Sequence, residues 1–425
     1  MTNIIPPLKG TRDFYPEVMA IRKWLYNTIA LVSESFGYQE YDGPFLESLE
    51  LYAAKSGEEL VKDQSFAFAD RGGDMITLRP ELTPSLARMI AQRQRQLVFP
   101  LRWWSYGPFW RYERPQKGRT REFFQWNADL IGADSPEADA ELVALIAAFF
   151  TRVGLSPDDA VILVNNRRLL DAQLQAAGIS VVQKPVVSRW IDRRDKLSAE
   201  AWVAYGSEIG LTNSQIDAMQ NMLEDKELWQ QSEELVRLFS AAQTMGISPY
   251  LKFDPGIVRG LDYYTGTVFE AQEARGEIRR AILGGGRYEN LVAAVGGDPL
   301  PGVGFAMGDV VISLILESKG LVPADVSAYP AVVLVTVFDK ELQPASLALA
   351  STLRQAGINT NLYPEAAKLP KQFKYADRLG IRLAAVIGPD EAAQGLVTLK
   401  NLADGSQVTI PASQVPPAIR EKLST

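Results

Sequence analysis

The sequence has 425 residues, of which 47% are hydrophobic and 22% are charged, a composition typical of a globular protein with two or three domains. It contains neither cysteine nor histidine, which excludes disulfides, zinc sites and imidazole catalysis. Any metal must therefore bind to carboxylates and phosphates, and Mg²⁺ is the natural candidate. The net charge of −7 argues against general coating of a nucleic acid but leaves room for a local basic patch.

Two features of the chain bear on its location. No apolar run approaches the length needed to span a bilayer. The first residues lack the charged and apolar pattern of a signal peptide. We therefore expect a cytoplasmic protein.

The N-terminal part is predicted to alternate between helices and strands. Apolar residues recur at helical spacing over residues 18–36, and an extended segment follows at 38–45. Residues 64–79 alternate as two strands around a turn, which predicts a hairpin. A further helix is expected over residues 84–91, with a proline at its first position.

Glu81 and Thr83 lie immediately before that helix. One interpretation is structural, because a threonine followed by proline is a common way to cap a helix. The other is functional, with both side chains binding the amino group of a substrate. A single residue could serve both purposes.

Residues 103–129 predict a second hairpin, with strands over 103–111 and 122–129 joined by a basic loop over 112–121. Because side chains alternate along a strand, one face of the returning strand carries Phe123, Gln125, Asn127 and Asp129. Polar residues on that face suggest that it lines a polar cavity. The cations of the hairpin suit a polyphosphate or a nucleic-acid backbone, although such a run is usually a solvated tip: Arg111, Arg114, Lys117, Arg119 and Arg121.

The next region, roughly 166–250, is helical in pattern and carries no chemical motif. Residues 263–270 then have strand character, and Gly266 leaves a bare spot beside Tyr264 that a ligand or another backbone could approach. A core strand with a glycine bulge is an equally good interpretation of this pattern. Residues 282–292 show three glycines before an expected amphipathic helix, and residues 301–312 predict a strand followed by a buried helix.

A domain boundary is expected near Tyr329, because the pattern beyond it changes to alternating strands and helices. This order predicts a compact α/β domain with a mixed sheet that ends in a hairpin and a final helix. Basic residues cluster around its second helix and form either a solvated helix face or a phosphate-facing surface: Lys368, Lys371, Lys374, Arg378 and Arg382.

Several stretches resemble the signatures of the histidyl-tRNA synthetase family. The string Arg-Gly-Leu-Asp-Tyr-Tyr-Thr-Gly-Thr-Val-Phe-Glu at 259–270 is similar to the family's histidine-specific signature, and Arg-Tyr-Glu-Arg-Pro-Gln-Lys-Gly-Arg at 111–119 is similar to its second class II motif. Leu-Arg-Pro-Glu at 78–81 and Gly-Gly-Gly-Arg-Tyr at 284–288 match further family strings. The resemblance covers nearly the full chain.

The resemblance implies an α+β fold. Residues 1–325 would form a class II catalytic domain, an antiparallel sheet with flanking helices and a helical insertion at about 166–250. Residues 330–425 would form an α/β anticodon-binding domain. The helix–strand pair at the N-terminus looks like the first class II motif, which implies a homodimer.

The implied activity is a histidine–tRNA ligase that uses ATP with Mg²⁺, forms histidyl-adenylate and charges tRNA(His). The resemblance implies catalytic roles for Arg259 and Arg111. The implied histidine-binding residues are Glu81, Thr83, Arg111, Gln125, Asp129, Arg259, Tyr263, Tyr264 and Tyr288. The implied ATP-binding residues are Arg111, Glu113, Arg119 and Arg121, and those for the tRNA acceptor end are Arg114, Gln116 and Lys117.

The chain departs from the family pattern in two places. Phe124 stands where the family often has a histidine, and Asp309-Val310-Val311 stands where the third class II motif normally ends in an arginine that binds the ATP γ-phosphate. Another cation such as Arg119 or Arg121 would have to replace it, or activation is impaired. The missing arginine leaves open a catalytically inactive relative, the histidine-binding regulatory subunit of ATP phosphoribosyltransferase. A synthetase for threonine or proline is a more distant alternative.

Overall fold

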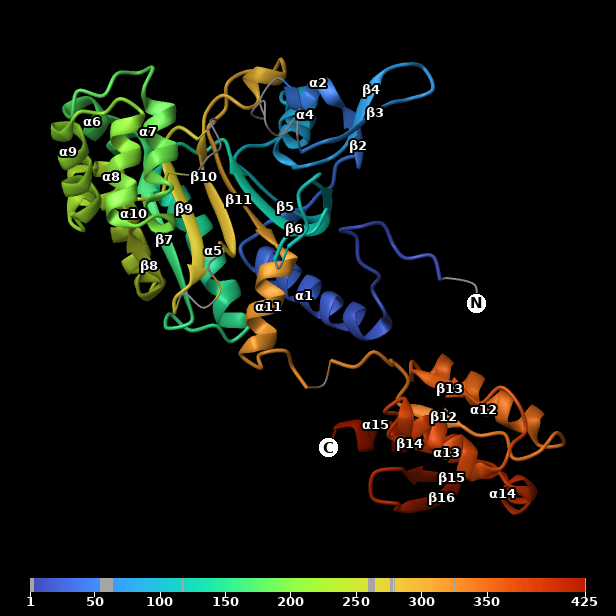
Figure 1. The fold of residues 1–425 in the computed structure, drawn as a ribbon. Helices are drawn as coiled ribbons and strands as arrows, with labels where there is room; N and C mark the ends of the chain where they lie inside the picture. The colour runs from blue at the N-terminus through green and yellow to red at the C-terminus, as the bar shows by residue number, and fades with distance from the viewer. Residues whose placement is uncertain are drawn as a thin grey trace. The chain divides into compact units, whose positions relative to one another are not determined.

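The computed structural model describes residues 4–53, 64–116, 118–258, 264–275, 278, 280–324 and 326–424. The chain divides into two compact units. The larger contains residues 1–13 and 23–323, and the smaller contains residues 14–22 and 324–425. Each unit has its own sheet and its own hydrophobic core, and each is described separately below (Figure 1).

The larger unit is built on an eight-stranded sheet with the order β1-β5-β6-β11-β10-β9-β7-β8. Its central pairs are antiparallel, and only the edge pairs β1–β5 and β7–β8 are parallel. A separate three-stranded sheet has the order β2-β4-β3. The strands are β1 (Gln39–Glu40), β2 (Leu46–Ser48), β3 (Phe66–Ala69), β4 (Met75–Leu78), β5 (Leu101–Trp110), β6 (Glu122–Ile131), β7 (Ala160–Asn166), β8 (Leu251–Phe253), β9 (Thr267–Glu273), β10 (Leu283–Tyr288) and β11 (Gly302–Gly308).

Helices flank this sheet, and a series of them follows β7. The helices up to the end of the larger unit are α1 (Pro16–Ser35), α2 (Leu49–Ala53), α4 (Thr83–Arg93), α5 (Pro136–Arg152), α6 (Arg167–Ala176), α7 (Lys184–Ile191), α8 (Ala199–Glu208), α9 (Asn213–Glu224), α10 (Glu233–Thr244) and α11 (Asp309–Ser318). The antiparallel sheet with flanking helices confirms the predicted fold class, and the segment predicted to be helical consists of α6 to α10.

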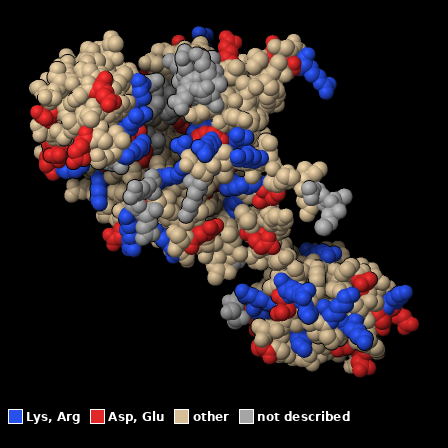
Figure 2. Space-filling view, in the orientation of Figure 1, with Lys and Arg blue, Asp and Glu red and all other residues tan. Residues whose placement is uncertain are grey.

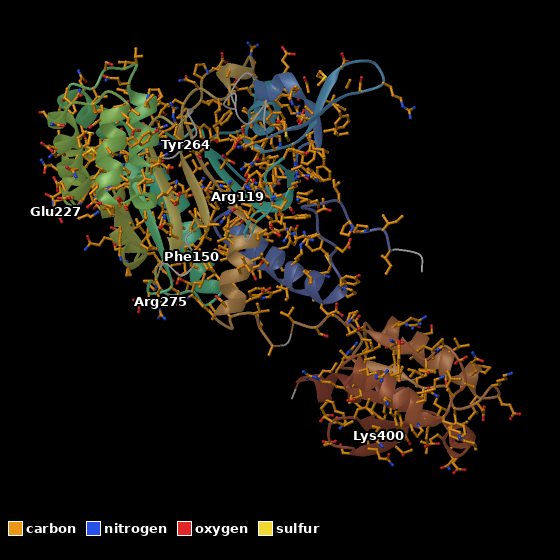
Figure 3. The ribbon with its side chains drawn as sticks, viewed as in Figure 1. Arg119, Phe150, Glu227, Tyr264, Arg275 and Lys400 are labelled. Atoms are coloured by element: carbon orange, nitrogen blue, oxygen red, sulfur yellow. The ribbon has the colours of Figure 1, made fainter. Side chains whose placement is uncertain are left out.

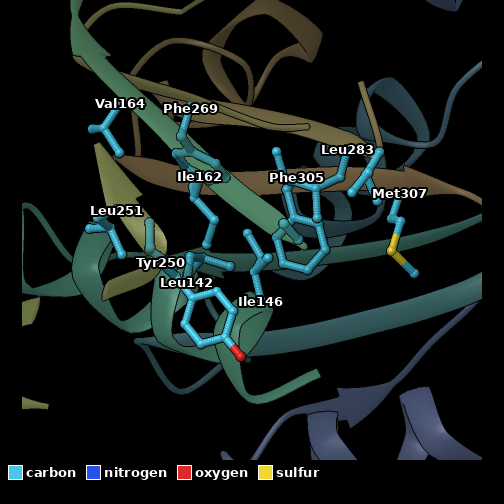
Figure 4. Packing of buried hydrophobic residues seen from close by; sticks show 14 of the residues in the cluster. Leu142, Ile146, Ile162, Val164, Tyr250, Leu251, Phe269, Leu283, Phe305 and Met307 are labelled. Atoms are coloured by element: carbon cyan, nitrogen blue, oxygen red, sulfur yellow. The ribbon is translucent and has the colours of Figure 1, made fainter. Parts of the chain in front are cut away.

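Helix α5 covers one face of the central strands. It is buried along most of its length because residues 142–150 are all apolar. Its N-cap is Ser135, whose side chain accepts a hydrogen bond from the Ala138 N–H. Leu142 and Ile146 pack against Phe269 of β9 and other sheet residues in the main core (Figure 4). Burial of each such side chain contributes roughly 1.5–3 kcal/mol. With this face occupied, the opposite face of the sheet is the one available to a ligand.

The smaller unit has a five-stranded mixed sheet with the order β13-β12-β14-β15-β16. The first three strands are parallel, and β15 and β16 form an antiparallel hairpin against them. This arrangement confirms the predicted mixed α/β sheet, while the short helix α14 was not predicted. The elements are β12 (Val333–Val335), α12 (Gln343–Gln355), β13 (Thr360–Leu362), α13 (Leu369–Arg378), β14 (Leu383–Val386), α14 (Pro389–Gln394), β15 (Leu396–Asn401), β16 (Gln407–Pro411) and α15 (Val415–Ser424).

The prediction for the glycine-rich segment was wrong. The three glycines lie inside strand β10 and not before a helix, and the segment after them forms only a 3-10 turn at Ala293–Val295. A Cβ atom on Gly285 would lie 2.3 Å from the Gly304 carbonyl oxygen, and one on Gly286 would lie 2.8 Å from the Tyr264 ring. These glycines are needed because neighbouring groups lie against the strand, which a pattern of turn residues does not indicate.

Two smaller expectations also differ from the structure. Strand β9 begins at Thr267, so Tyr264 precedes it, and the space beside Gly266 is filled by the stem of Arg287, 3.1 Å from where a Cβ would lie. Helix α4 has Leu82 at its N-cap and no side-chain capping bond, so Thr83 does not cap it.

Candidate active site

A cleft of about 1410 Å³ lies on the face of the eight-stranded sheet opposite α5. Its lining comes from β6, β9, β10 and β11, from the loop between β5 and β6, and from the helical segment after β7. Lys and Arg side chains gather in this middle part of the larger unit (Figure 2). The cations of its lining are Arg111, Arg119, Arg194, Lys196, Lys226 and Arg280, and the carboxylates are Glu113, Asp192, Asp254, Glu270 and Glu273.

Strand β6 supplies the row of polar residues that the sequence predicted. Trp126, Ala128 and Leu130 point into the core on the α5 side, so the alternate residues occupy the other face. Phe123 and Gln125 line the cleft. This confirms the assignment of faces on β6.

Asp129 lies at the buried end of this row. Its side chain is 5% exposed and accepts a 2.7 Å hydrogen bond from the hydroxyl group of Tyr288 on β10. Burial raises the pKa of Asp129 from 3.8 to about 7, and the bond from Tyr288 opposes this shift. The carboxyl group is therefore able to gain or lose a proton near neutral pH, and it is a hydrogen-bond acceptor for an N–H group when ionised.

Glycines on the adjacent strands make room for this pair. In register, Asp129 of β6 is opposite Gly304 of β11, and Gly304 is opposite Gly286 of β10. A Cβ atom on Gly304 would lie 2.0 Å from the Asp129 Oδ1 atom. The carboxyl group therefore occupies space that only glycine leaves open.

Hydrogen-bonding capacity remains around Asp129. Tyr41 and Asn127 are both largely buried, and within the described chain the hydroxyl of Tyr41 and the Nδ2 atom of Asn127 have no hydrogen-bond partner. The charge on Asp129 also raises the pKa of Tyr41, after the larger effect of burial. Because buried polar atoms normally have a partner, this end of the sheet face suits a polar ligand. The sequence analysis did not identify Tyr41.

Arg111 contacts the Leu-Arg-Pro-Glu segment at residues 78–81. Its Nε atom donates a 3.0 Å hydrogen bond to the Pro80 carbonyl, and its guanidinium carbon lies 5.3 Å from the centre of the Phe123 ring. Glu81 is 7% exposed, and Thr83 is half-buried at the start of α4. The structure therefore places Arg111 next to the segment that carries Glu81.

The charged residues of the loop between β5 and β6 lie in different places: some line the cleft and others do not. Arg119 forms a 2.8 Å ion pair with Glu113, and both line the cleft. Arg121 is not in the cleft lining: its guanidinium stacks 4.0 Å from the centre of the Tyr112 ring, and its stem lies against Gly10. Arg114 and Gln116 are exposed on the loop.

Three residues named by the sequence fall outside the described part of the chain: Lys117, Arg259 and Tyr263. Tyr264, which follows them, is 9% exposed and packs in one hydrophobic cluster with Leu86 of α4 and Tyr288. Figure 3 shows Tyr264 and Arg119 in the central part of the larger unit. The two predicted tyrosines that the structure describes thus lie together near Asp129.

Four cations of the cleft were not predicted from the sequence: Arg194, Lys196, Lys226 and Arg280. The first three come from the helical segment, where no motif marks them, because their proximity to the sheet arises only on folding.

Asp309, which stands in the third-motif segment, is 3% exposed and absent from the cleft lining. Its carboxylate accepts bonds from the Phe124 N–H at 2.9 Å and from the Arg12 Nη2 atom at 3.0 Å.

The residues present are compatible with magnesium. Among the described residues, no group of three or more acidic side chains could by itself hold a metal ion. Glu113 of the loop and Glu270 of β9 are two of the carboxylates that line the cleft. Mg²⁺ is usually held by one or two carboxylates together with substrate phosphates and waters, so this donor set fits an ion that enters with a nucleotide.

No helix in the described ranges has the length and apolarity to cross a membrane.

Comparisons with known proteins agree with this architecture. Residues 10–309 match the family model described as histidyl-tRNA synthetase, and residues 331–422 match that of an anticodon binding domain. The chain is 38% identical over 434 residues to a histidine–tRNA ligase of Opitutus terrae, covering 98% of both. It is also 38% identical to the chloroplastic/mitochondrial histidine–tRNA ligase of Arabidopsis thaliana, over 97% of this chain and 86% of that protein. The crystal structure of histidyl-tRNA synthetase from Nostoc sp. has a TM-score of 0.85 and 29% identity, covering 99% of this chain and 100% of that one.

Proposed function

The chain belongs to the histidyl-tRNA synthetase family, and we propose that it activates histidine with ATP and transfers the histidyl group to tRNA(His). The observation that carries this proposal is the cleft. It brings Arg111, Glu113, Arg119 and Gln125 to one side of the sheet, in a chain that aligns over its length with histidine–tRNA ligases.

The first step needs no general base. The α-carboxylate of histidine has a pKa of about 3.3–3.7 and is already ionised at neutral pH. One of its oxygens attacks the α-phosphorus of ATP, the bond to the bridging oxygen breaks, and pyrophosphate leaves with the electron pair. The protein must supply positioning and positive charge where negative charge develops. Arg111 is suited to this because a guanidinium group binds two phosphate oxygens at once.

We propose that histidine binds between α4 and the row on β6. The imidazole N–H would donate to Asp129, which Tyr288 holds in place through its 2.7 Å hydrogen bond. Glu81 and Thr83 would bind the amino group, and Gln125 and Tyr264 would complete the pocket. Arg259 and Tyr263 keep the roles that the family signature implies, as catalytic arginine and pocket tyrosine.

We propose that ATP extends from this pocket toward the loop between β5 and β6. Arg111 would bind the α-phosphate, and Glu113 and Arg119 would lie beside the nucleotide. Glu113 and Glu270 would hold Mg²⁺, which when bound would neutralise charge on the phosphates. Arg121 remains a predicted contact, although its stacking on Tyr112 favours a role in supporting the loop.

For tRNA, we propose that Arg114, Gln116 and Lys117 contact the acceptor end. The first two are exposed on the loop beside the cleft, where a nucleic-acid strand could reach them. The smaller unit would bind the anticodon, in agreement with its match to an anticodon binding domain. Lys and Arg side chains spread over the face of this unit that carries α13 (Figure 2).

We also propose the domain bounds, the quaternary state and the location of the protein. The catalytic domain would span 1–325 with an insertion at about 166–250, and the anticodon-binding domain 330–425. The enzyme would act as a homodimer, because the family's first motif builds such an interface. It would work in the cytoplasm, where histidine, ATP and tRNA are all available.

The regulatory-subunit alternative is less favoured. It rests on the missing arginine of the third motif, whereas the curated relatives that align over nearly the whole chain are ligases. The smaller unit and the cationic loop are parts that a histidine sensor does not require.

The test is amino-acid-dependent exchange of pyrophosphate into ATP, run with a panel of amino acids and followed by charging of tRNA(His). We expect exchange with histidine alone, and we expect Arg259→Ala and Arg111→Ala to abolish it. Histidine binding without exchange would support the regulatory relative, and exchange with another amino acid would refute the assignment of the pocket.

A further inference from the structure

Arg280 lies in the connection between β9 and β10, and its half-buried side chain lines the cleft. This side chain reaches the loop between β5 and β6. A Cβ atom placed on Gly118 would lie 3.0 Å from the Cδ atom of Arg280. Two segments that are far apart in the sequence therefore meet at one side of the cleft.

The Arg280 guanidinium is unpaired among the residues that the structure describes. Two other cations of the cleft have carboxylate partners: Arg119 pairs with Glu113 at 2.8 Å, and Lys196 pairs with Asp192 at 2.7 Å. Arg111 donates to a backbone carbonyl. Arg280 thus offers all its donors to a ligand.

The electrostatic surroundings of Arg280 favour an anion. Burial lowers the pKa of Arg280, the positive charge of Arg119 lowers it further, and the Glu113 carboxylate only partly opposes this. Two guanidinium groups that repel each other inside a cleft would both be stabilised by an anion between them.

The register of the sheet places this anion site relative to the histidine pocket. One row across the sheet consists of Trp126 of β6, Met307 of β11 and Leu283 of β10. Asp129 follows Trp126 by three residues on β6, which runs parallel to β10. Arg280 lies three residues before Leu283 in the opposite direction. Arg280 and Asp129 therefore lie on opposite sides of this row along the strand direction.

The start of α11 cannot supply a cation to this end. Gly308, Val310 and Val311 line the cleft there, and the Asp309 carboxylate is turned away to Arg12 and the Phe124 N–H. A phosphate group in the cleft must find its positive charge on other elements.

We propose that Arg280 binds the terminal phosphates of ATP, and the pyrophosphate formed from them, opposite Arg119. This inference rests on the proposed function and adds a phosphate-binding residue to it. Arg111 follows Trp110, which is opposite Glu122 of β6, so Arg111 also lies on the side of Trp126 away from Asp129. A nucleotide bound by Arg111 therefore has Arg119 and Arg280 within the same part of the cleft for its remaining phosphates. A guanidinium group there can bind two phosphate oxygens, and it takes the place of the arginine that the third motif lacks.

The first test is titration calorimetry of the full-length protein with magnesium pyrophosphate. Arg280→Ala should lower the affinity roughly tenfold or more, since a hydrogen bond to a charged group is worth about 1.5–3 kcal/mol. Arg280→Lys should fall between Arg280→Ala and the wild type, because an ammonium keeps the charge but not the fork. Arg275→Ala is the matched control: Arg275 is exposed in the same connection, outside the cleft lining and well away from Arg119 (Figure 3). It should leave the affinity unchanged.

A second measurement separates phosphate binding from a structural role. Removing Arg280 relieves repulsion with Arg119, so the Tm of the ligand-free Arg280→Ala variant should equal or exceed that of the wild type. Its rise in Tm on adding ATP should be smaller. Transfer from preformed histidyl-adenylate to tRNA should be unchanged, because pyrophosphate takes no part in that step.

An unchanged pyrophosphate affinity in Arg280→Ala would overturn the proposal, and so would a lower Tm together with an equal loss of the transfer step. Failure of the proposed function would look different. Wild-type protein would then give no histidine-dependent exchange, while the pyrophosphate titration would still decide whether Arg280 binds the anion.

Discussion

The hydroxyl group of Tyr288 donates a 2.7 Å hydrogen bond to the Asp129 carboxyl group across three strands of the sheet. Both residues are nearly fully buried, and Gly302 and Gly304 of β11 leave the space that their side chains occupy. A buried carboxyl group with one neutral donor keeps a raised pKa, because the donor compensates only part of the lost hydration.

Asp129→Asn should therefore change how stability depends on pH. The folded-state pKa of about 7 lies above the ordinary value of 3.8, so the folded protein holds a proton that the unfolded chain releases between these values. This contribution to stability is fully present below pH 3.8 and is lost as pH rises toward 7. The variant lacks the titrating group, so relative to wild type it should become more stable by a few kcal/mol between pH 4 and 7.5.

Urea unfolding of both proteins across this range measures the difference. Asp158→Asn removes an exposed carboxylate and is the control, for which the difference from wild type should stay constant. A constant difference for Asp129→Asn as well would mean that Asp129 is ionised throughout. The same variant should raise the KM for histidine, since an amide can present its N–H₂ group where an acceptor is needed.

The buried Arg287–Asp139 pair should be important for stability. Arg287 donates to Asp139 at 2.6 Å and to the carbonyl groups of Ala133 and Ser135, which ties β10 to the start of α5. Arg287→Met should lower the free energy of unfolding by about 3–5 kcal/mol, because it leaves a buried carboxylate without its partner.

Equilibrium denaturation tests this prediction. Arg237→Met breaks the similar but exposed pair with Glu137 and should have little effect, since solvent screens such pairs. The double variant Arg287→Met/Asp139→Leu should recover part of the lost stability. If Arg287→Met and Arg237→Met were equally mild, the buried pair would have no special role.

An arginine at Asp309, the first of the three residues that stand in place of the third-motif arginine, should harm this protein. Asp309→Arg would leave the Phe124 N–H without its acceptor and would place a second guanidinium beside Arg12. We expect the free energy of unfolding to fall by a few kcal/mol, with no gain in the rate of pyrophosphate exchange. Glu317→Arg, at an exposed position near the other end of α11, is the control. Faster exchange by Asp309→Arg would contradict this prediction and would show that an arginine at this position can reach the nucleotide.

The sequence analysis predicted the hairpin of β5 and β6 and the faces of β6 correctly because strict alternation reports a half-buried strand directly. The smaller unit was predicted almost completely because short apolar strand segments alternate with helical patterns along the chain. Helix α5 was not predicted, although most of the core packs around it, because an apolar helix that is buried on nearly all sides shows little periodicity. The glycines of β10 were misread as a turn, since local rules treat such residues as chain breakers.

The amino-acid sequence by itself determined the class of fold, the family and the polar row from Phe123 to Asp129, since residue identity and strand alternation are local properties. Only the tertiary structure decided which charges meet. It turned Asp309 toward Arg12, stacked Arg121 on Tyr112, and brought Arg280 to Gly118. These contacts join residues far apart in the chain, and their geometry follows from strand register and packing, which no local pattern of residues specifies.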